Sequence, residues 1–377
     1  MADNDSNDSQ SVHLPHDLIV HHILPWLPIK SLMQYKLVSK QWYSSISSPT
    51  FIKTHLKLTP FSDPFTPLES LIIQSGHGYY LYECDDDDDD LEHGVQWQNL
   101  IQFEGGYMFR DTYLVGSSNG LVCLAHYKNE YFILWNPTTT QHRIHYPDEG
   151  FGNQKPNFIN WGFGYVSSEN DHKVIRISLI WANDRFINAV HVYSLRFNRW
   201  KKIKFGLDHY FFPQRARLVH GFLYWAWNCK STDSIKLVSF DLYREKFEIV
   251  HHLDLNSESD MLCVMGGCLS KCTCNPPNGL KIDILKSQFG VCSVDVQCDL
   301  TQTNFVDLVG FTKTGKILLV DDVNRRILRL DFGSETEKSV AILRWCGKDT
   351  RIDGYVPSAV SPYPSPELGQ VAYLYSS

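Results

Sequence analysis

Between residues 13 and 57, apolar side chains are spaced for short helices that prolines separate. The first group shares one helical face and consists of Leu18, Ile19, Ile23, Leu24 and Leu27. Pro15 suits the first turn of this helix, where its missing N–H has no helical partner. Pro28 ends the helix because its ring disfavours helical angles at the residue before it. Ser31 is a suitable N-cap for the next helix. The pattern predicts three or four short helices, too few to cover their own apolar faces.

From residue 68 to residue 377 the pattern changes to short β-branched and aromatic runs separated by turns. A strand that ends just before a turn recurs roughly 45 to 58 residues apart, at Trp135, Tyr193, Phe240, Ile284 and Leu330. Such spacing, with several strands in each unit, is typical of propeller blades. The sequence therefore predicts an α+β multidomain protein: a small all-α module followed by an all-β domain, propeller-like or, as the alternative, a β-sandwich.

Three segments fall outside these two domains. Residues 1–12 are polar and acidic, and we expect a disordered tail there. Residues 58–67 are rich in proline and mark the boundary between the domains. Residues 85–90 are six consecutive aspartates, whose mutual repulsion predicts an exposed acidic loop inside the β domain.

Composition excludes several classes of protein. The formal net charge of −7 argues against nonspecific nucleic-acid binding, which needs a basic surface. No apolar run approaches the roughly 20 residues that span a membrane, and the N-terminus lacks the basic start and apolar centre of a signal peptide. We therefore expect a soluble protein of the cytoplasm, the nucleus or both, with no nucleic acid or membrane as partner.

One cysteine cluster is a candidate metal site: Cys263, Cys268, Cys272 and Cys274. Zinc sites prefer two pairs of ligands separated by a loop, whereas these four thiols lie within a dozen residues along a strand and its turn. We expect thiols that pack in the core and no bound metal or cofactor. The chain also lacks a nucleophile elbow and a phosphate-binding loop, so no enzymatic activity is predicted.

The N-terminal motifs resemble those of a known family. They comprise Leu14, Pro15, Asp17 and Leu18; then Ile23, Leu24, Leu27, Pro28, Lys30, Ser31 and Leu32; then Val38, Ser39, Lys40 and Trp42; and finally Ser47, Ser48, Pro49 and Phe51. With this spacing, residues 13–57 resemble the F-box of plant F-box proteins. The resemblance implies that the module binds a Skp-type adaptor, which tethers it to a cullin ubiquitin ligase.

Matched to this chain, the family's adaptor contacts are Leu14, Pro15, Leu18, Ile23, Leu24, Leu27, Pro28 and Leu32, with Val38 and Trp42 shared between the interface and the module core. Pro25 departs from the family pattern, which has a good helix former there. Proline removes one helical hydrogen bond. We therefore expect a kink in the last turn before Pro28, and weaker adaptor binding than is usual for the family.

The β domain also contains recognisable motifs: Asn119-Gly120-Leu121, Trp135-Asn136-Pro137-Thr138, Gly164-Tyr165, Val192-Tyr193-Ser194-Leu195 with Trp200-Lys201, Gly221-Phe222-Leu223-Tyr224-Trp225 and Ser239-Phe240-Asp241-Leu242. They resemble the F-box-associated, kelch-related domain of plant F-box proteins. The resemblance fades after Met261, where the chain carries Ile284-Leu285-Lys286 and Val291-Cys292-Ser293 in place of the family's tryptophan motifs.

Together the two resemblances imply a substrate-recognition subunit of a Skp–cullin–F-box ubiquitin ligase. The subunit would bind a target protein through the β domain. Exposed aromatic side chains on loops are typical protein-recognition anchors, and the best candidate in this sequence is the run His209, Tyr210, Phe211 and Phe212. The alternatives are an adaptor-bound scaffold that promotes no degradation and a β-propeller enzyme with a helical cap.

Overall fold

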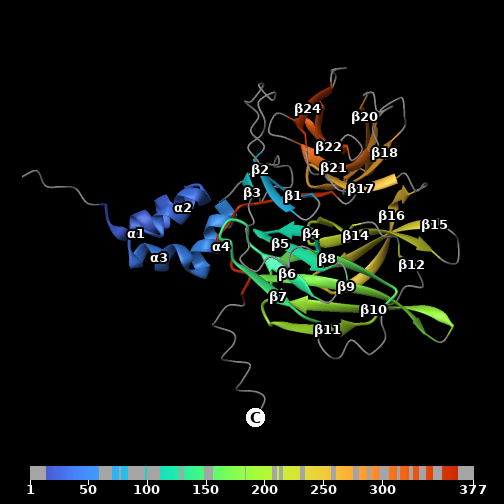
Figure 1. The fold of residues 1–377 in the computed structure, drawn as a ribbon, viewed down its shortest axis with the longest axis horizontal. Coiled ribbons are helices and arrows are strands. Elements are labelled where there is room, and N and C mark those ends of the chain that lie inside the picture. Colours follow the sequence, from blue (N-terminus) through green and yellow to red (C-terminus); the bar gives the residue numbers. More distant parts are fainter. Residues whose placement is uncertain are drawn as a thin grey trace, which may run out of the picture. The chain divides into compact units, whose positions relative to one another are not determined.

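The computed structural model divides the chain into two compact units, Met1–Ser62 and Asp63–Ser377, and each is described here by itself (Figure 1). The division falls in the proline-rich connection. The residues that the structure describes are 14–58, 70–75, 78–83, 98–99, 111–126, 128, 131–147, 156–182, 184–205, 210–211, 215–229, 234–255, 260–274, 280–286, 290–296, 305–311, 315–321, 326–330, 337–342 and 350–363. The predicted N-terminal tail and the aspartate run 85–90 lie outside these residues.

The first unit is helical, as the apolar spacing predicts. Its elements are α1 (His16–Leu18), η1 (Ile19–Ile23), η2 (Leu24–Trp26), α2 (Ile29–Tyr35), α3 (Lys40–Ser47) and α4 (Pro49–Leu58). Two serines cap the later helices: Ser39 Oγ accepts a hydrogen bond from the N–H of Trp42 at 3.1 Å, and Ser48 Oγ accepts one from the N–H of Phe51 at 3.3 Å. The predicted cap at Ser31 is wrong, because α2 begins one turn earlier with Pro28 at its N-cap.

Pro25 changes the geometry of the first helix. Since its nitrogen carries no hydrogen, the α-helical bond to the carbonyl of residue 21 cannot form. The chain instead makes a π-helical turn, in which the N–H of Leu24 bonds to the carbonyl of Ile19. A 3₁₀ turn follows, closed by the N–H of Leu27 and the carbonyl of Leu24 at 3.1 Å. Leu27 is already extended, as expected before Pro28.

The second unit consists of antiparallel sheets. In the described residues they number six. Three contain the first half of the domain: β1 (Ser70–Ser75), β2 (Gly78–Glu83) and β3 (Gln98–Asn99) with β25 (Arg351–Gly354); β4 (Thr112–Ser118), β5 (Leu121–His126), β6 (Phe132–Trp135) and β7 (His142–His145); and β8 (Phe158–Val166), β9 (Asp171–Ala182), β10 (Arg185–Ser194) and β11 (Arg199–Ile203).

The other three sheets follow in sequence. They are β12 (Tyr210–Phe211), β13 (Arg217–Val219), β14 (Phe222–Cys229), β15 (Ser234–Asp241) and β16 (Lys246–Leu255); β17 (Asp260–Met265), β18 (Cys268–Cys274), β19 (Leu280–Lys286) and β20 (Gly290–Val296); and β21 (Phe305–Phe311), β22 (Ile317–Asp321), β23 (Arg326–Leu330) and β24 (Glu337–Ile342).

Contacts between inner strands join the six sheets in cyclic order. Strand β25 contacts β4, β4 contacts β8, β8 contacts β13 and β14, β13 contacts β17, β17 contacts β21, and β21 contacts β25. The six described sheets therefore form a closed ring, which confirms the predicted propeller, and the β-sandwich alternative is wrong. The first blade is shared between distant parts of the chain, since β25 pairs with β1 and Ile352 lies opposite Ile73.

The hydrophobic core lies between neighbouring blades. The largest fully buried side chains are examples: Trp225 and Trp227 of β14 pack with Ile177 and Val190 of the preceding blade. Trp135 of β6 packs with Ile72 of the first blade. A propeller blade buries both of its faces in this way, which explains the continuous apolar runs in strands such as β5 and β6.

The segment after β25 is anchored to the second blade by Asn136, which is fully buried. Its Nδ2 donates to the carbonyls of Ser358 at 3.0 Å and Val360 at 2.7 Å. Its Oδ1 accepts from the N–H of Thr138 at 2.9 Å and from the hydroxyl of Tyr355 at 3.1 Å. The Trp-Asn-Pro-Thr motif therefore holds the segment that follows β25, the strand that closes the ring.

Candidate functional site

The helical unit carries an exposed apolar surface at its N-terminal end. Leu14 is 58% exposed, and Leu18 and Ile23 on α1 and η1 are exposed as well. The two prolines of the predicted interface, Pro15 and Pro28, also face solvent. Large apolar side chains left in water are energetically unfavourable, and when they gather on one small module they indicate a site for another protein.

The structure separates the ten predicted adaptor contacts by burial. Exposed positions are Leu14, Pro15, Leu18, Ile23, Pro28 and Val38, and half-buried positions are Leu27 and Trp42. Leu24 and Leu32 are 1% and 0% exposed. These two side chains belong to the core of the helical unit, and their predicted contact with an adaptor stays a prediction. The helical spacing placed them on the same face as their exposed neighbours, but the π and 3₁₀ turns rotate Leu24 away from that face.

Three exposed apolar residues were missed by the sequence reasoning. Trp26 in η2 is 67% exposed and Leu37, directly after α2, is 87% exposed. Tyr43 on α3 is also exposed, with the ammonium of Lys36 5.8 Å from its ring centroid. Trp26 stands beside Pro25, so a helical-wheel argument that assumes regular α-helix misplaces it. Leu37 could have been found, since an apolar residue in a turn has no core to join.

A buried histidine of α4 bonds to the turn at Leu27, next to the exposed surface. His55 of α4 is 3% exposed, and its Nε2 lies 3.0 Å from the carbonyl oxygen of Leu27. Burial lowers the pKa of His55, although the hydrogen bond to Leu27 opposes the shift. The neutral ring thus ties the last helix to the turn that presents Trp26 and Pro28.

In the β domain, the predicted target-binding run is only partly described. Tyr210 and Phe211 form the short strand β12, which pairs with the end of β14 opposite Asn228 and Trp227. The expectation of a loop is therefore wrong at these two residues. His209 and Phe212 lie outside the described residues, and the role of the run in target binding stays a prediction.

The cysteine cluster packs as core where its side chains are described. Cys263 of β17 and Cys272 of β18 are buried in the apolar cluster between the fifth and sixth blades. Cys268 is half-buried, and the side chain of Cys274 is not described. The described part of the chain contains no group of three or more His, Cys, Asp or Glu side chains that could hold a metal ion.

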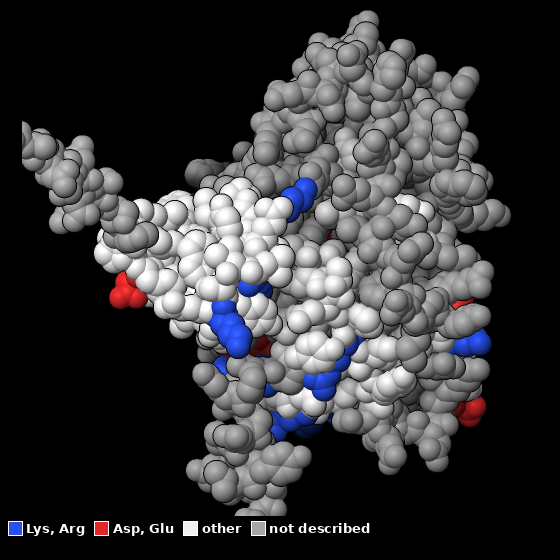
Figure 2. Space-filling view, turned by 60° about the vertical axis from the view of Figure 1, so that its left-hand side comes forward, with Lys and Arg blue, Asp and Glu red and all other residues white. Residues whose placement is uncertain are grey.

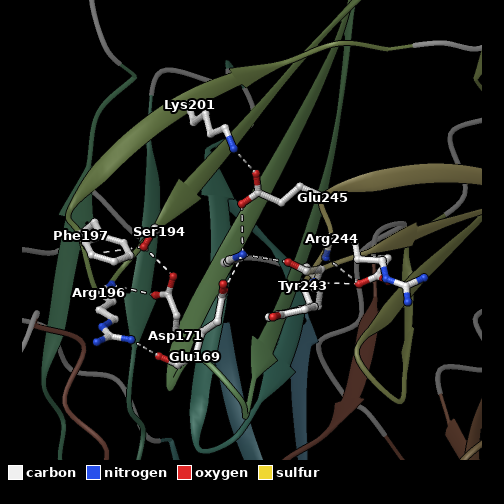
Figure 3. Close-up of polar contacts among 12 residues, drawn as sticks. Glu169, Asp171, Ser194, Arg196, Phe197, Lys201, Tyr243, Arg244 and Glu245 are labelled. Carbon is white, nitrogen blue, oxygen red and sulfur yellow. Dashed lines mark hydrogen bonds and ion pairs between the residues drawn. The ribbon is translucent and has the colours of Figure 1, made fainter.

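Hydrogen bonds between polar groups hold the turns at the ends of the strands in the third blade (Figure 3). Asp171 accepts hydrogen bonds from the hydroxyl of Ser194 at 2.5 Å and from the N–H of Arg196 at 2.8 Å. Lys173, from the same strand β9, reaches the next blade and donates to Glu245 at 3.1 Å. Burial works to lower the pKa of Lys173, but hydrogen bonds to Glu169 and Glu245 outweigh it and raise that pKa. These hydrogen bonds hold the turns in place, and with them the side chains that the turns expose.

Two protein families match this arrangement. The F-box domain matches residues 12–54, the range of the helical unit. The F-box-associated beta propeller domain matches residues 91–342, more than half of the chain. This chain is a member of the F-box protein family. Because the second match continues through the fifth and sixth blades, the fading of the motifs after Met261 reflects divergence within the family's fold.

Curated relatives of this F-box protein come from Arabidopsis thaliana. An F-box/kelch-repeat protein is 28% identical over 246 residues, which are 62% of this chain and 65% of that protein. The F-box protein CPR1 is 28% identical over 303 residues, 68% of this chain and 65% of that protein. The chain thus spans about 65% of the length of the relatives it matches. No described helix of this F-box protein is long and apolar enough to cross a membrane.

Proposed function

We propose that this F-box protein is a substrate-recognition subunit of a Skp–cullin–F-box ubiquitin ligase. The F-box would bind a Skp-type adaptor, and through it a cullin, while the propeller would bind a target protein. The observation that carries the proposal is the exposed apolar surface of the F-box at Leu14, Leu18 and Ile23. These side chains have no core of their own to fill, and their places match the family's adaptor contacts.

The protein would catalyse no reaction itself. Holding the target and the cullin arm on one chain raises the effective concentration of the target near the ubiquitin-loaded enzyme. A propeller suits this task because it holds exposed loops on a rigid ring of blades. We expect the complex to work in the cytoplasm, the nucleus or both, which imaging of a fluorescently tagged chain tests.

The adaptor half of the proposal is tested by co-precipitation of the full chain with a Skp-type adaptor. The double variant Leu14→Ala/Pro15→Ala should weaken adaptor binding by roughly 10- to 100-fold, because truncating anchors of this kind costs about 1–3 kcal/mol in all. A matched control is Phe158→Ala/Trp181→Ala, which removes two exposed aromatic side chains of the propeller. Unchanged binding by the first variant would refute the placement of the interface.

The ligase half is tested separately, since an adaptor-bound scaffold would pass the first test. Proteins that proximity labelling finds on the propeller should accumulate when the proteasome is blocked. They should also accumulate when the chain carries Leu14→Ala/Pro15→Ala. If captured proteins keep their levels under both conditions, the chain acts as a scaffold rather than a degradation receptor.

A further inference from the structure

The outer edges of the second and third blades meet in a patch of arginines and aromatic rings. We call it the arginine–aromatic patch, and its members are Arg143, Tyr146, Arg196, Phe197, Arg199 and Tyr363. Tyr146, Phe197 and Tyr363 are 58%, 53% and 51% exposed. Aromatic rings beside guanidinium groups are the side chains most enriched at the energetic centres of protein interfaces.

Contacts between the blades and the C-terminal segment assemble the patch. Arg143 of β7 donates from Nη2 to Asn198 Oδ1 at 3.0 Å, which joins the second blade to the β10–β11 turn of the third. The Arg143 guanidinium also lies 5.7 Å from the ring centroid of Tyr363. The hydroxyl of Tyr363 donates to the carbonyl of His142 at 3.0 Å. Arg143, Tyr363 and the β10–β11 turn are therefore joined in one surface, and Trp200 Nε1 donates to the carbonyl of Tyr146 at 3.2 Å beside it.

The β10–β11 turn contributes the centre of the patch. The guanidinium groups of Arg196 and Arg199 lie 5.4 and 5.2 Å from the ring centroid of Phe197, so the ring makes cation–π contacts with both. Arg196 is fixed further, since its Nη1 donates to the carbonyl of Glu169 at 2.6 Å. Figure 3 shows Phe197 and Arg196 on this turn beside the Asp171 hydrogen bonds that brace it. The binding groups are thus positioned in advance, which lowers the entropy cost of binding.

The positive charge of the patch is not neutralised within the described structure. None of the described carboxylates forms an ion pair with Arg143, Arg196 or Arg199. This is notable in a chain of net charge −7. In the equivalent turn of the fourth blade, by contrast, Arg244 is 3.7 Å from the carboxylate of Asp241.

The charge of Arg143 affects the neighbouring side chain of His145. Burial, and after it the charge of Arg143, lowers the pKa of His145 to about 3. Figure 2 shows Lys and Arg side chains on this face of the molecule among described residues that are mostly uncharged.

We propose that the arginine–aromatic patch binds an acidic segment of the target protein. Guanidinium groups pair with carboxylates through two parallel hydrogen bonds, and an apolar residue next to the acids would pack against Phe197 or Tyr146. The proposal rests on the proposed function, whose target-binding half it specifies. The lysines of strand β11 are not part of the patch. Their charge on an edge strand opposes pairing with other sheets, and Lys201 already forms an ion pair with Glu245 at 2.8 Å.

The test uses the full chain purified with a Skp-type adaptor. The probe is a fluorescent peptide in which glutamate alternates with serine around one central leucine, and its matched control has glutamine at every glutamate. We expect anisotropy to show binding of the acidic peptide only, with affinity that falls as salt is added. The variant Arg196→Gln/Arg199→Gln should bind the peptide at least about tenfold more weakly. Phe197→Ser should weaken binding but leave the dependence of affinity on salt unchanged.

The fourth blade offers matched controls, because its equivalent turn exposes Tyr243 and Arg244. The variants Arg244→Gln/Lys246→Gln and Tyr243→Ser should leave peptide binding unchanged. Equal losses in the two turns, or no binding by the parent chain, would overturn the proposal. Binding that appears only after residues 85–90 are changed to asparagine would also overturn it, since the patch would then hold the chain's own aspartates. Adaptor capture on the same samples reports the other half of the function independently.

Discussion

Burial at single residues decides which part of the F-box is available to a partner. Leu24 and Trp26 lie two positions apart, yet the first is 1% and the second 67% exposed. Pro25 between them forces the turn geometry that produces this difference. Exposed and buried residues therefore alternate within one short segment, and substitutions in it should separate into two kinds.

Leu24→Ala should mainly lower stability, whereas Trp26→Ala should mainly weaken adaptor binding. Removing the buried leucine should destabilise the helical unit by about 2–5 kcal/mol, because it leaves a cavity. Removing the exposed tryptophan should change stability by less than about 0.5 kcal/mol and weaken adaptor capture. Denaturant titration followed by helical circular dichroism, with adaptor co-precipitation, measures both. Loss of stability with Trp26→Ala would show that its ring is part of the core.

At the scale of elements, the hairpin turns shape each blade, and two of them are matched. Asn119 and Gly120 join β4 to β5, and His220 and Gly221 join β13 to β14, all four at positive φ. Two-residue turns of this kind match the twist of the paired strands and favour Asn and Gly. The two turns differ in their surroundings: a Cβ on Gly120 would collide with the side chain of Ser358, whereas the space at Gly221 is open.

Gly120→Ala should therefore cost more stability than Gly221→Ala. Both variants carry the cost of a left-handed backbone, about 1 kcal/mol or somewhat more. Only Gly120→Ala also displaces the segment that Asn136 anchors, so its unfolding free energy should fall by at least about 2 kcal/mol more. Thermal unfolding of the two variants compares them directly. Equal losses would show that the C-terminal segment is loosely held.

For the whole molecule, buried neutral histidines make the propeller sensitive to acid. Burial lowers the pKa of His172 to about 4, although the carbonyls of Ser118 and Asn119 oppose the shift. Burial lowers the pKa of His191 to about 4 as well, helped by Arg176 and Lys202. His172 lies against the carbonyl of Ser118 in the neighbouring blade and His191 is buried, so protonation of either ring places a charge in a buried site.

Propeller stability should be highest above pH 6.5 and fall as pH drops towards 4. The folded pKa values lie below the ordinary 6.5, so the unfolded chain binds more protons in this window. Each histidine then contributes a loss of up to about 1.4 kcal/mol per pH unit. Denaturant midpoints measured across this range test the expectation. His172→Gln should flatten the profile of stability against pH, and the exposed His220→Asn should not. If His172→Gln and the parent chain gave identical profiles, His172 would be removed as a cause.

Periodicity in the sequence located most of the propeller. The recurring strand ends at Trp135, Tyr193, Phe240, Ile284 and Leu330 all fall at or near the end of the third strand of a blade. The pattern repeats because each of these third strands carries an apolar run that is followed by a turn. The first blade escaped detection because its innermost strand, β25, is separated from β1 by most of the chain.

The sequence by itself indicated a helical module followed by a β domain, because helical and strand periods and turn residues are local properties, and its motifs supplied the resemblance to the family. The resemblance also pointed to Leu14 at the start of the F-box, which the structure leaves exposed. Only the tertiary structure decided that Leu24 and Leu32 are core, that Asn136 holds the segment that follows β25, and that Arg143 and Phe197 share a surface. Those outcomes depend on contacts between residues far apart in the chain, which no local pattern records.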